Sequence, residues 1–209
     1  MTNHLPAAFK ALWHELPLVA SAGVLVCTAS ALVVLLSPGL SPLSVLLTAL
    51  VVSPVWAAVI ATTDAVVLKD RGGVPQLLKN LWKTAAAGLE VGIVPGVVVA
   101  VALVNWHALS PLFALPFAIS GCVSVLLLLA SCYAFSLRVT SGLRGKRLWF
   151  TALHLVARAP LVPLGVLALV VVALLLSTSV TASLLLLAPG PVALFASAGT
   201  WMEKDALHR

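Results

Sequence analysis

Residues 85–104 read AAAGLEVGIVPGVVVAVALV, a run of twenty residues with a single charged side chain, Glu90. An α-helix needs about 20 predominantly apolar residues to cross the hydrocarbon core of a bilayer. Gly88, Gly92 and Gly96 recur every four residues in this run, which places them on one face of a helix. Small residues at this spacing are typical of helices that pack closely inside membranes. The stretch therefore predicts a membrane-spanning helix with a close-packing face.

Five further apolar blocks surround this run. The 209 residues are 62% apolar and 9% charged, whereas soluble domains are roughly 25% charged. We therefore predict an all-α polytopic membrane helix bundle, with six transmembrane helices in a single integral membrane domain. The predicted spans are residues 16–36, 43–67, 85–104, 112–137, 161–176 and 180–201, and an amphipathic head, 1–15, precedes them. The fifth block is short, so five spans is the alternative.

Lysine and arginine residues are confined to alternate connections of this six-helix pattern. The connections after the second and fourth blocks and the two chain ends hold all twelve, and the other three connections hold none. Positive residues in short loops stay on the cytoplasmic side, so both termini are expected in the cytoplasm. Tryptophans near these ends predict a cytoplasmic aromatic belt of Trp13, Trp82, Trp149 and Trp201, with Trp106 at the outer edge.

Two of the basic connections also carry the pattern of an amphipathic helix. Apolar residues recur at helical spacing in 74–85 and again in 148–156, with basic residues on the opposite side. Such helices lie in the headgroup layer, where each Lys or Arg near an anionic leaflet contributes ~1 kcal/mol. We predict that both lie on the cytoplasmic membrane surface. The expected residues for anionic lipid headgroups are Lys79, Lys83, Arg144, Lys146, Arg147 and Arg158.

The two basic connections resemble each other. Four residues around the first reappear around the second at a nearly constant offset, and Leu81-Trp82 reappears as Leu148-Trp149. The four pairs are Ala65 and Ala134, Leu68 and Leu137, Lys69 and Arg138, and Gly73 and Gly142. An internal duplication and the shared chemistry of membrane interfaces both explain the likeness.

The second block carries small residues that match the glycines of the third, including Ala57 and Ala61. Short connections make sequential helices neighbours. We therefore predict that Gly88, Gly92 and Gly96 pack against this stripe within one chain. A homodimer seam is the alternative, which leaves self-association open.

Asp64 and Glu90 are the only acidic residues inside the predicted spans. Both lie near the cytoplasmic edge, close in sequence to Lys69 and Lys83, so each carboxylate can snorkel or pair with a cation. Glu90 is rotated about 200° from Gly88 on a helix, which turns it away from the face that carries Asp64. An ion- or proton-binding role is the alternative, because acidic residues inside membranes often mark such sites.

The sequence predicts no catalytic residue, metal site or cofactor. HExxH, GxSxG and P-loop motifs are absent, and the three cysteines lie singly in apolar blocks. The formal charge of +6 is concentrated in short segments that lack RNA-binding patterns. We therefore expect a non-enzymatic protein whose partners are membrane lipids and not nucleic acid.

Residues 53–67, SPVWAAVIATTDAVV, with the basic turn and Leu81-Trp82 that follow, resemble the core of the YesL-like family of bacterial integral membrane proteins. The resemblance covers residues 5–100, and the chain departs from the family in its longer turn around 37–42. It implies a bacterial cytoplasmic membrane location and an accessory or scaffold role beside a sugar transporter in carbohydrate uptake. A small solute or ion-coupled transporter that uses Asp64 or Glu90 is the alternative function.

Overall fold

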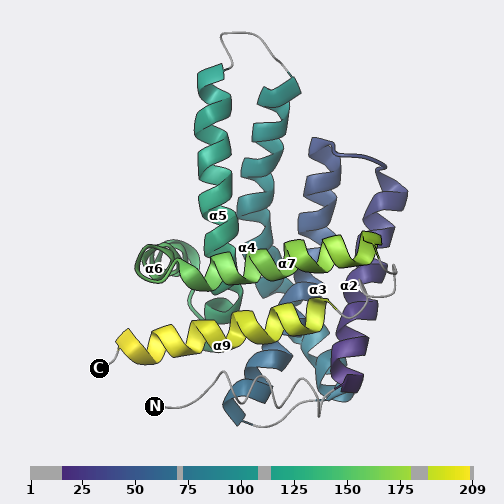
Figure 1. The fold of residues 1–209 in the computed structure, drawn as a ribbon, viewed down its shortest axis with the longest axis vertical. Helices are drawn as coiled ribbons and strands as arrows, with labels where there is room; N and C mark the ends of the chain where they lie inside the picture. Colours follow the sequence, from purple (N-terminus) through teal and green to yellow (C-terminus); the bar gives the residue numbers. More distant parts are fainter. Residues whose placement is uncertain (1–15, 70–72, 108–113, 180–187, 208–209) are drawn as a thin grey trace.

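The computed structural model describes residues 16–69, 73–107, 114–179 and 188–207, and nearly all of these are helical (Figure 1). The predicted head, 1–15, lies outside the described residues. The helices are α2 (Leu16–Leu36), α3 (Pro42–Lys69), α4 (Val74–His107), α5 (Ala114–Ser141), α6 (Gly145–Arg158), α7 (Leu161–Ser179) and α9 (Pro189–Leu207).

Four of these helices, α2 to α5, are long and apolar enough to cross a membrane. The pair α6 and α7 meets at 86° across a short break and adds a fifth span only if both count as one broken span. Figure 1 shows α7 and α9 running across the other long helices instead of alongside them. The predicted all-α fold is therefore confirmed, with four to five helices or helix pairs suited to cross a membrane. The sixth predicted span is not confirmed, because α9 begins only at Pro189.

The glycine face of α4 packs against α3, as predicted. A methyl group added at Gly88 would lie 2.6 Å from the Ser53 carbonyl oxygen and 2.9 Å from Ala57 Cβ. One added at Gly92 would overlap the side chain of Ser53. Contact this close is possible only because the glycines lack a side chain.

The part of α3 that contacts the glycines extends from Ala57 back to Ala49 and does not include Ala61, which was predicted to take part. A methyl group at Gly96 would lie 2.7 Å from Ala49 Cβ, whereas Ala61 is not among the groups nearest to any of the three glycines. Each step of four residues forward along α4 matches a step of four back along α3. In this register Ala61 lies opposite Thr84, which carries a side chain, so the closest contact ends at Ala57.

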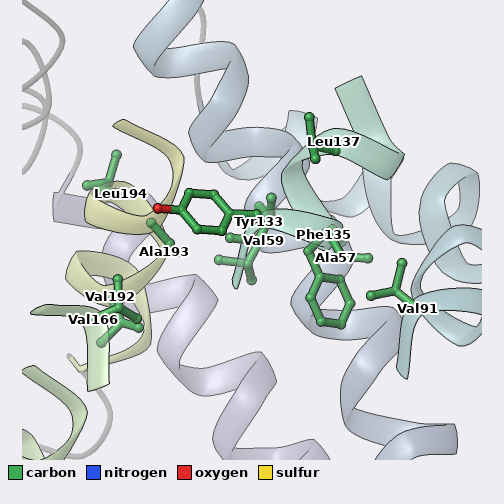
Figure 2. Close-up of a cluster of buried hydrophobic side chains, with 14 of the residues drawn as sticks. Ala57, Val59, Val91, Tyr133, Phe135, Leu137, Val166, Val192, Ala193 and Leu194 are labelled. Atoms are coloured by element: carbon green, nitrogen blue, oxygen red, sulfur yellow. The ribbon is translucent and has the colours of Figure 1, made fainter. Parts of the chain in front are cut away.

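The buried core takes side chains from all seven described helices. Figure 2 labels those of α3, α4, α5, α7 and α9. Tyr133 of α5 is completely buried, and its hydroxyl donates a 2.8 Å hydrogen bond to the Ala159 carbonyl oxygen. Ala159 precedes Pro160, and a residue before proline is pushed out of helical conformation. The tyrosine thus satisfies a backbone carbonyl at the break between α6 and α7.

Of the two predicted surface helices, only the second is a separate helix. Residues 74–85 are the first turns of the continuous helix α4 and not a separate element. Helix α6 is separate, but its apolar residues Leu148, Ala152 and Leu155 are buried within the protein. The prediction that this stripe faces lipid is wrong, because the bundle itself covers it. The exposed side of α6 is therefore its basic side.

The two basic turns share one backbone feature. Gly73 follows α3 with φ of 136°, and Gly142 follows α5 with φ of 67°. Positive φ is readily adopted by glycine, which has no Cβ. The likeness seen in the sequence therefore extends to the turns, but it stops beyond them, where α4 runs on unbroken and α6 ends at a bend.

We expect Gly92→Ala to destabilise the protein by about 1–3 kcal/mol, because the new methyl group overpacks the contact with Ser53. Gly121→Ala is the matched control: nothing lies within 4 Å of its added methyl group, and removing a mid-helix glycine favours the helix by about 1 kcal/mol. Thermal unfolding in detergent, followed by circular dichroism, measures both variants. Equal stability of the two would contradict the packing described here.

Candidate functional site

The carboxylate of Asp64 lies in the interior of the bundle, where the residue is 1% exposed. Ser136 Oγ lies 2.9 Å from Oδ1 and 2.8 Å from Oδ2, and Thr140 Oγ1 lies 2.6 Å from Oδ2. Trp201 Nε1 donates to Oδ1 over 3.1 Å. Two hydroxyl groups of α5 and one indole of α9 thus surround a carboxylate of α3.

The helical period explains why these groups meet. Ser136 and Thr140 are four residues apart and lie one above the other on α5. Trp201 lies four residues after Ser197 on α9, and Ser197 Oγ is 2.9 Å from Thr63 Oγ1. Two successive turns of α9 therefore bind two successive residues of α3.

Thr62, which precedes Thr63 and Asp64 on α3, binds a further helix, α4. Asn80 of α4 is buried, and its Nδ2 donates to Thr62 Oγ1 over 3.1 Å. Consecutive residues of a helix point about 100° apart. Thr62, Thr63 and Asp64 therefore reach α4, α9 and α5 from one point on α3. We call these three residues the polar hub.

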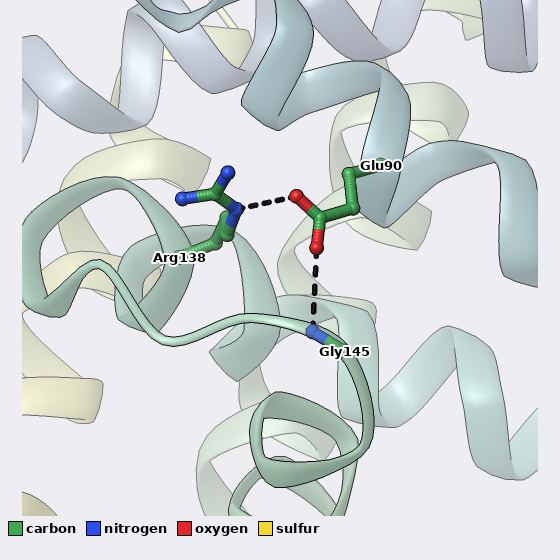
Figure 3. Close-up of polar contacts among 3 residues, drawn as sticks. All are labelled: Glu90, Arg138 and Gly145. Atoms are coloured by element: carbon green, nitrogen blue, oxygen red, sulfur yellow. Dashed lines mark hydrogen bonds and ion pairs between the residues drawn. The ribbon is translucent and has the colours of Figure 1, made fainter.

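Glu90 lies in a separate ion pair nearer the surface (Figure 3). Arg138 Nε of α5 donates to its Oε2 over 2.8 Å, and the backbone N–H of Gly145 donates to its Oε1 over 3.3 Å. The Glu90 side chain is 37% exposed and that of Arg138 is 11% exposed. This pair fastens α4 to the end of α5 and the start of α6.

The two acidic residues therefore differ from each other. Among the described side chains, the partners of Asp64 are all neutral. The side chain of Lys69, the cation expected beside it, lies outside that part of the chain. Glu90 does pair with a cation, but with Arg138 of another helix and not with the neighbouring Lys83. Glu90 and Asp64 do not contact each other, in agreement with the helical rotation.

Basic residues are exposed along α6 and the first turns of α4. The exposed set is Lys79, Lys83, Arg144, Lys146, Arg147 and Arg158, which are the predicted headgroup residues. Trp82 is 88% exposed beside Lys79 and Lys83, as an interfacial tryptophan would be, and Phe150 is 72% exposed on α6. Trp201, by contrast, is 7% exposed and bound to Asp64, so its predicted place in an aromatic belt is wrong. Trp13 lies outside the described residues.

An apolar pocket of about 320 Å³ lies between α2, α3, α7 and α9. Its lining includes Cys27, Trp56 and Val192 and none of the residues of the polar hub. In the described part of the chain, no three His, Cys, Asp or Glu side chains are grouped so that they could hold a metal ion. The pocket and the hub are therefore separate features.

Sequence reasoning missed the partners of both acidic residues. Ser136 and Thr140 carry a helical spacing of four that marks a polar face in an otherwise apolar block, and this signal was available. Trp201 had been assigned to the aromatic belt, and Arg138 to the basic connection after the fourth block. Their roles depend on how α9 and α5 pack on α3 and α4, which sequence spacing alone does not specify.

No family model, no curated protein and no solved structure matches this chain. The YesL-like resemblance therefore stays a prediction. The functional argument depends on the geometry of the chain's own residues.

We expect Asp64→Leu to destabilise the protein more than Glu90→Leu. The first change removes the acceptor shared by the Trp201 N–H and the hydroxyl groups of Ser136 and Thr140, and loss of a buried hydrogen-bond partner costs about 1–3 kcal/mol. The second breaks a partly exposed ion pair, and such pairs contribute about 1 kcal/mol or less. Thermal unfolding of both variants in the same detergent measures the difference. A larger loss for Glu90→Leu would mean that the polar hub does not hold the helices together.

Proposed function

We propose that the chain is a non-enzymatic integral membrane protein that acts as an accessory or scaffold component. Its working surface is the exposed basic side of α6 with the first turns of α4, and this surface binds anionic lipid headgroups. The observation that carries the proposal is the orientation of α6. Its apolar stripe is buried inside the protein, and its basic side is exposed.

The position of α6 along the chain favours contact with headgroups. It begins four residues after α5 ends, and α5 is a candidate membrane span. It is followed by α7, whose sequence LVPLGVLALVVVALLLSTS has no charged residue. A short basic helix between two apolar ones is restricted to the boundary between hydrocarbon and water. Phosphate oxygens of lipids lie at that depth, where Arg binds them through paired N–H groups.

The first turns of α4 provide a second basic segment. Lys79 and Lys83 are one helical turn apart and exposed, and Trp82 lies between them in the sequence. Lysine and tryptophan together are typical of helix ends that anchor at the membrane surface. Both segments adjoin the ends of spans that carry basic residues, so we place this side in the cytoplasm, together with both termini.

The proposed biological setting is a bacterial cytoplasmic membrane, with a role beside a sugar transporter in carbohydrate uptake. This part of the proposal is supported by the YesL-like resemblance of residues 53–67. The alternative, a transporter that uses Asp64 or Glu90, receives less support. Glu90 is already neutralised by Arg138, and neither carboxylate lines the apolar pocket described above.

The orientation is tested by cysteine labelling in a background without Cys27, Cys122 and Cys132. We expect Leu40→Cys, in the turn between α2 and α3, to react with an impermeant reagent added outside intact cells. His154→Cys on α6 should react only after the membrane is opened. The reverse pattern would place the basic surface outside and contradict the proposal.

The lipid proposal is tested with the triple variant Arg144→Gln, Lys146→Gln, Arg147→Gln. We expect it to retain severalfold less anionic phospholipid than the wild type after purification, measured by quantitative lipid mass spectrometry. Adding anionic lipid should raise the unfolding temperature of the wild type more than that of the variant. The effect should weaken as salt concentration rises, because exposed charges are screened.

The matched control is Arg144→Lys, Arg147→Lys, which keeps the charge of the surface. It should retain most of the bound anionic lipid, since attraction to an anionic leaflet depends chiefly on charge. If the triple glutamine variant retains as much anionic lipid as the wild type, the basic surface does not bind headgroups. The scaffold proposal would then need a protein partner in place of lipid.

A further inference from the structure

The polar hub has a property that the scaffold proposal does not use. Asp64 is an ionisable group in the interior of the bundle. Two hydroxyl groups of α5 and the Trp201 indole bind it, and the Ser197 hydroxyl of α9 also interacts with it. Moving an ionised carboxylate out of water is unfavourable when no cation lies beside it. Hydrogen bonds from three neutral groups offset part of that cost. The site therefore suits both the ionised and the neutral acid form.

The chemistry of the partners allows either form without moving the backbone. A serine or threonine hydroxyl is both donor and acceptor, so Ser136 and Thr140 can donate to a carboxylate or accept from a carboxylic acid. Trp201 can only donate, and Oδ1 accepts its N–H in both forms. Rotation of two hydroxyl groups is enough to accommodate a proton.

A cavity beside the hub is too small for more than a single water molecule. Its lining includes Thr63, Leu77 and Leu194, and its volume is about 10 Å³. That is at the lower limit for a single water molecule, for which roughly 10–15 Å³ is needed. A hydrated metal ion is larger still. A proton is the occupant that requires no space.

Among the described side chains of the surrounding helices, no charged group binds Asp64. On α5, Arg138 is bound to Glu90, and the Tyr133 hydroxyl donates to Ala159. On α4, Lys79 and Lys83 are exposed. Cys27 is the titratable residue of α2 and lines the separate apolar pocket. The side chains of Lys69, Glu203, Lys204 and Asp205 lie outside the described part of the chain.

We propose that Asp64 reversibly binds a proton inside the bundle, and that its charge state sets how firmly α9 is held through Trp201. A hydrogen bond to a charged acceptor is roughly twice as strong as one to a neutral acceptor. The ionised form therefore holds the indole more tightly, and protonation loosens α9. This inference is independent of headgroup binding by α6, because the two use different residues and different helices.

The test is infrared spectroscopy of the protein in lipid films, in the Asp70→Asn, Asp205→Asn background. The chain has three aspartates, so Asp64 is then the only one, and ¹³C-labelled aspartate separates its bands from those of glutamate. We expect an acid C=O band at low pH that is replaced by a carboxylate band as pH rises within the range where the protein stays folded. Asp64→Asn should remove both bands, and Glu90→Gln should keep them.

Hydrogen exchange of α9 amides provides the second measurement. At each pH, the exchange rate in Asp64→Asn is divided by the exchange rate in the wild type. This ratio should rise severalfold as pH rises through the interval in which the infrared band changes. Trp201→Phe, which removes the donor, should abolish that dependence while leaving the infrared transition in place. The proposal would be overturned if only the carboxylate band, or only the acid band, were seen at every pH at which the protein stays folded. A transition without any change at α9 would overturn its second half.

Discussion

Three consecutive side chains of α3 hold three other helices by hydrogen bonds, and the arrangement of the bundle depends on them. In lipid no hydrophobic force drives one apolar helix against another, so association depends on close fit and on polar contacts. Thr62, Thr63 and Asp64 supply the polar contacts, and the glycine face of α4 supplies the fit. Because the three residues project in different directions, one turn of α3 determines where α4, α5 and α9 lie.

The features most readily predicted from the sequence are those set by local periodicity. The α3–α4 contact follows from glycines spaced by four, and it was predicted with the correct face of α4. The solvent-exposed basic residues of α6 were also predicted. Both are properties that a single helix carries in its own residue order.

The features that were missed depend on contacts between distant parts of the chain. The apolar stripe of α6 has the same sequence pattern whether lipid or protein covers it. Lipid was predicted because the basic residues beside the stripe are typical of helices at a membrane surface. Trp201 lies near the end of an apolar block, where tryptophans commonly mark an interface, but it is 137 residues from Asp64 in the sequence and in contact with it in space. The confinement of basic residues to alternate connections likewise did not reveal that α7 and α9 cross the other helices.

The uninterrupted course of α4 has a mechanical consequence. At 34 residues it is about 51 Å long, against a hydrocarbon core of about 30 Å. Its first turns are therefore continuous with the segment in the bilayer, and a push or a twist on them is transmitted along a rigid rod to the contact with α3. The bend of 86° between α6 and α7 does the opposite. A force on α6 is not carried along a continuous helix axis, and it reaches the interior only through packed side chains such as Leu148, Ala152 and Leu155.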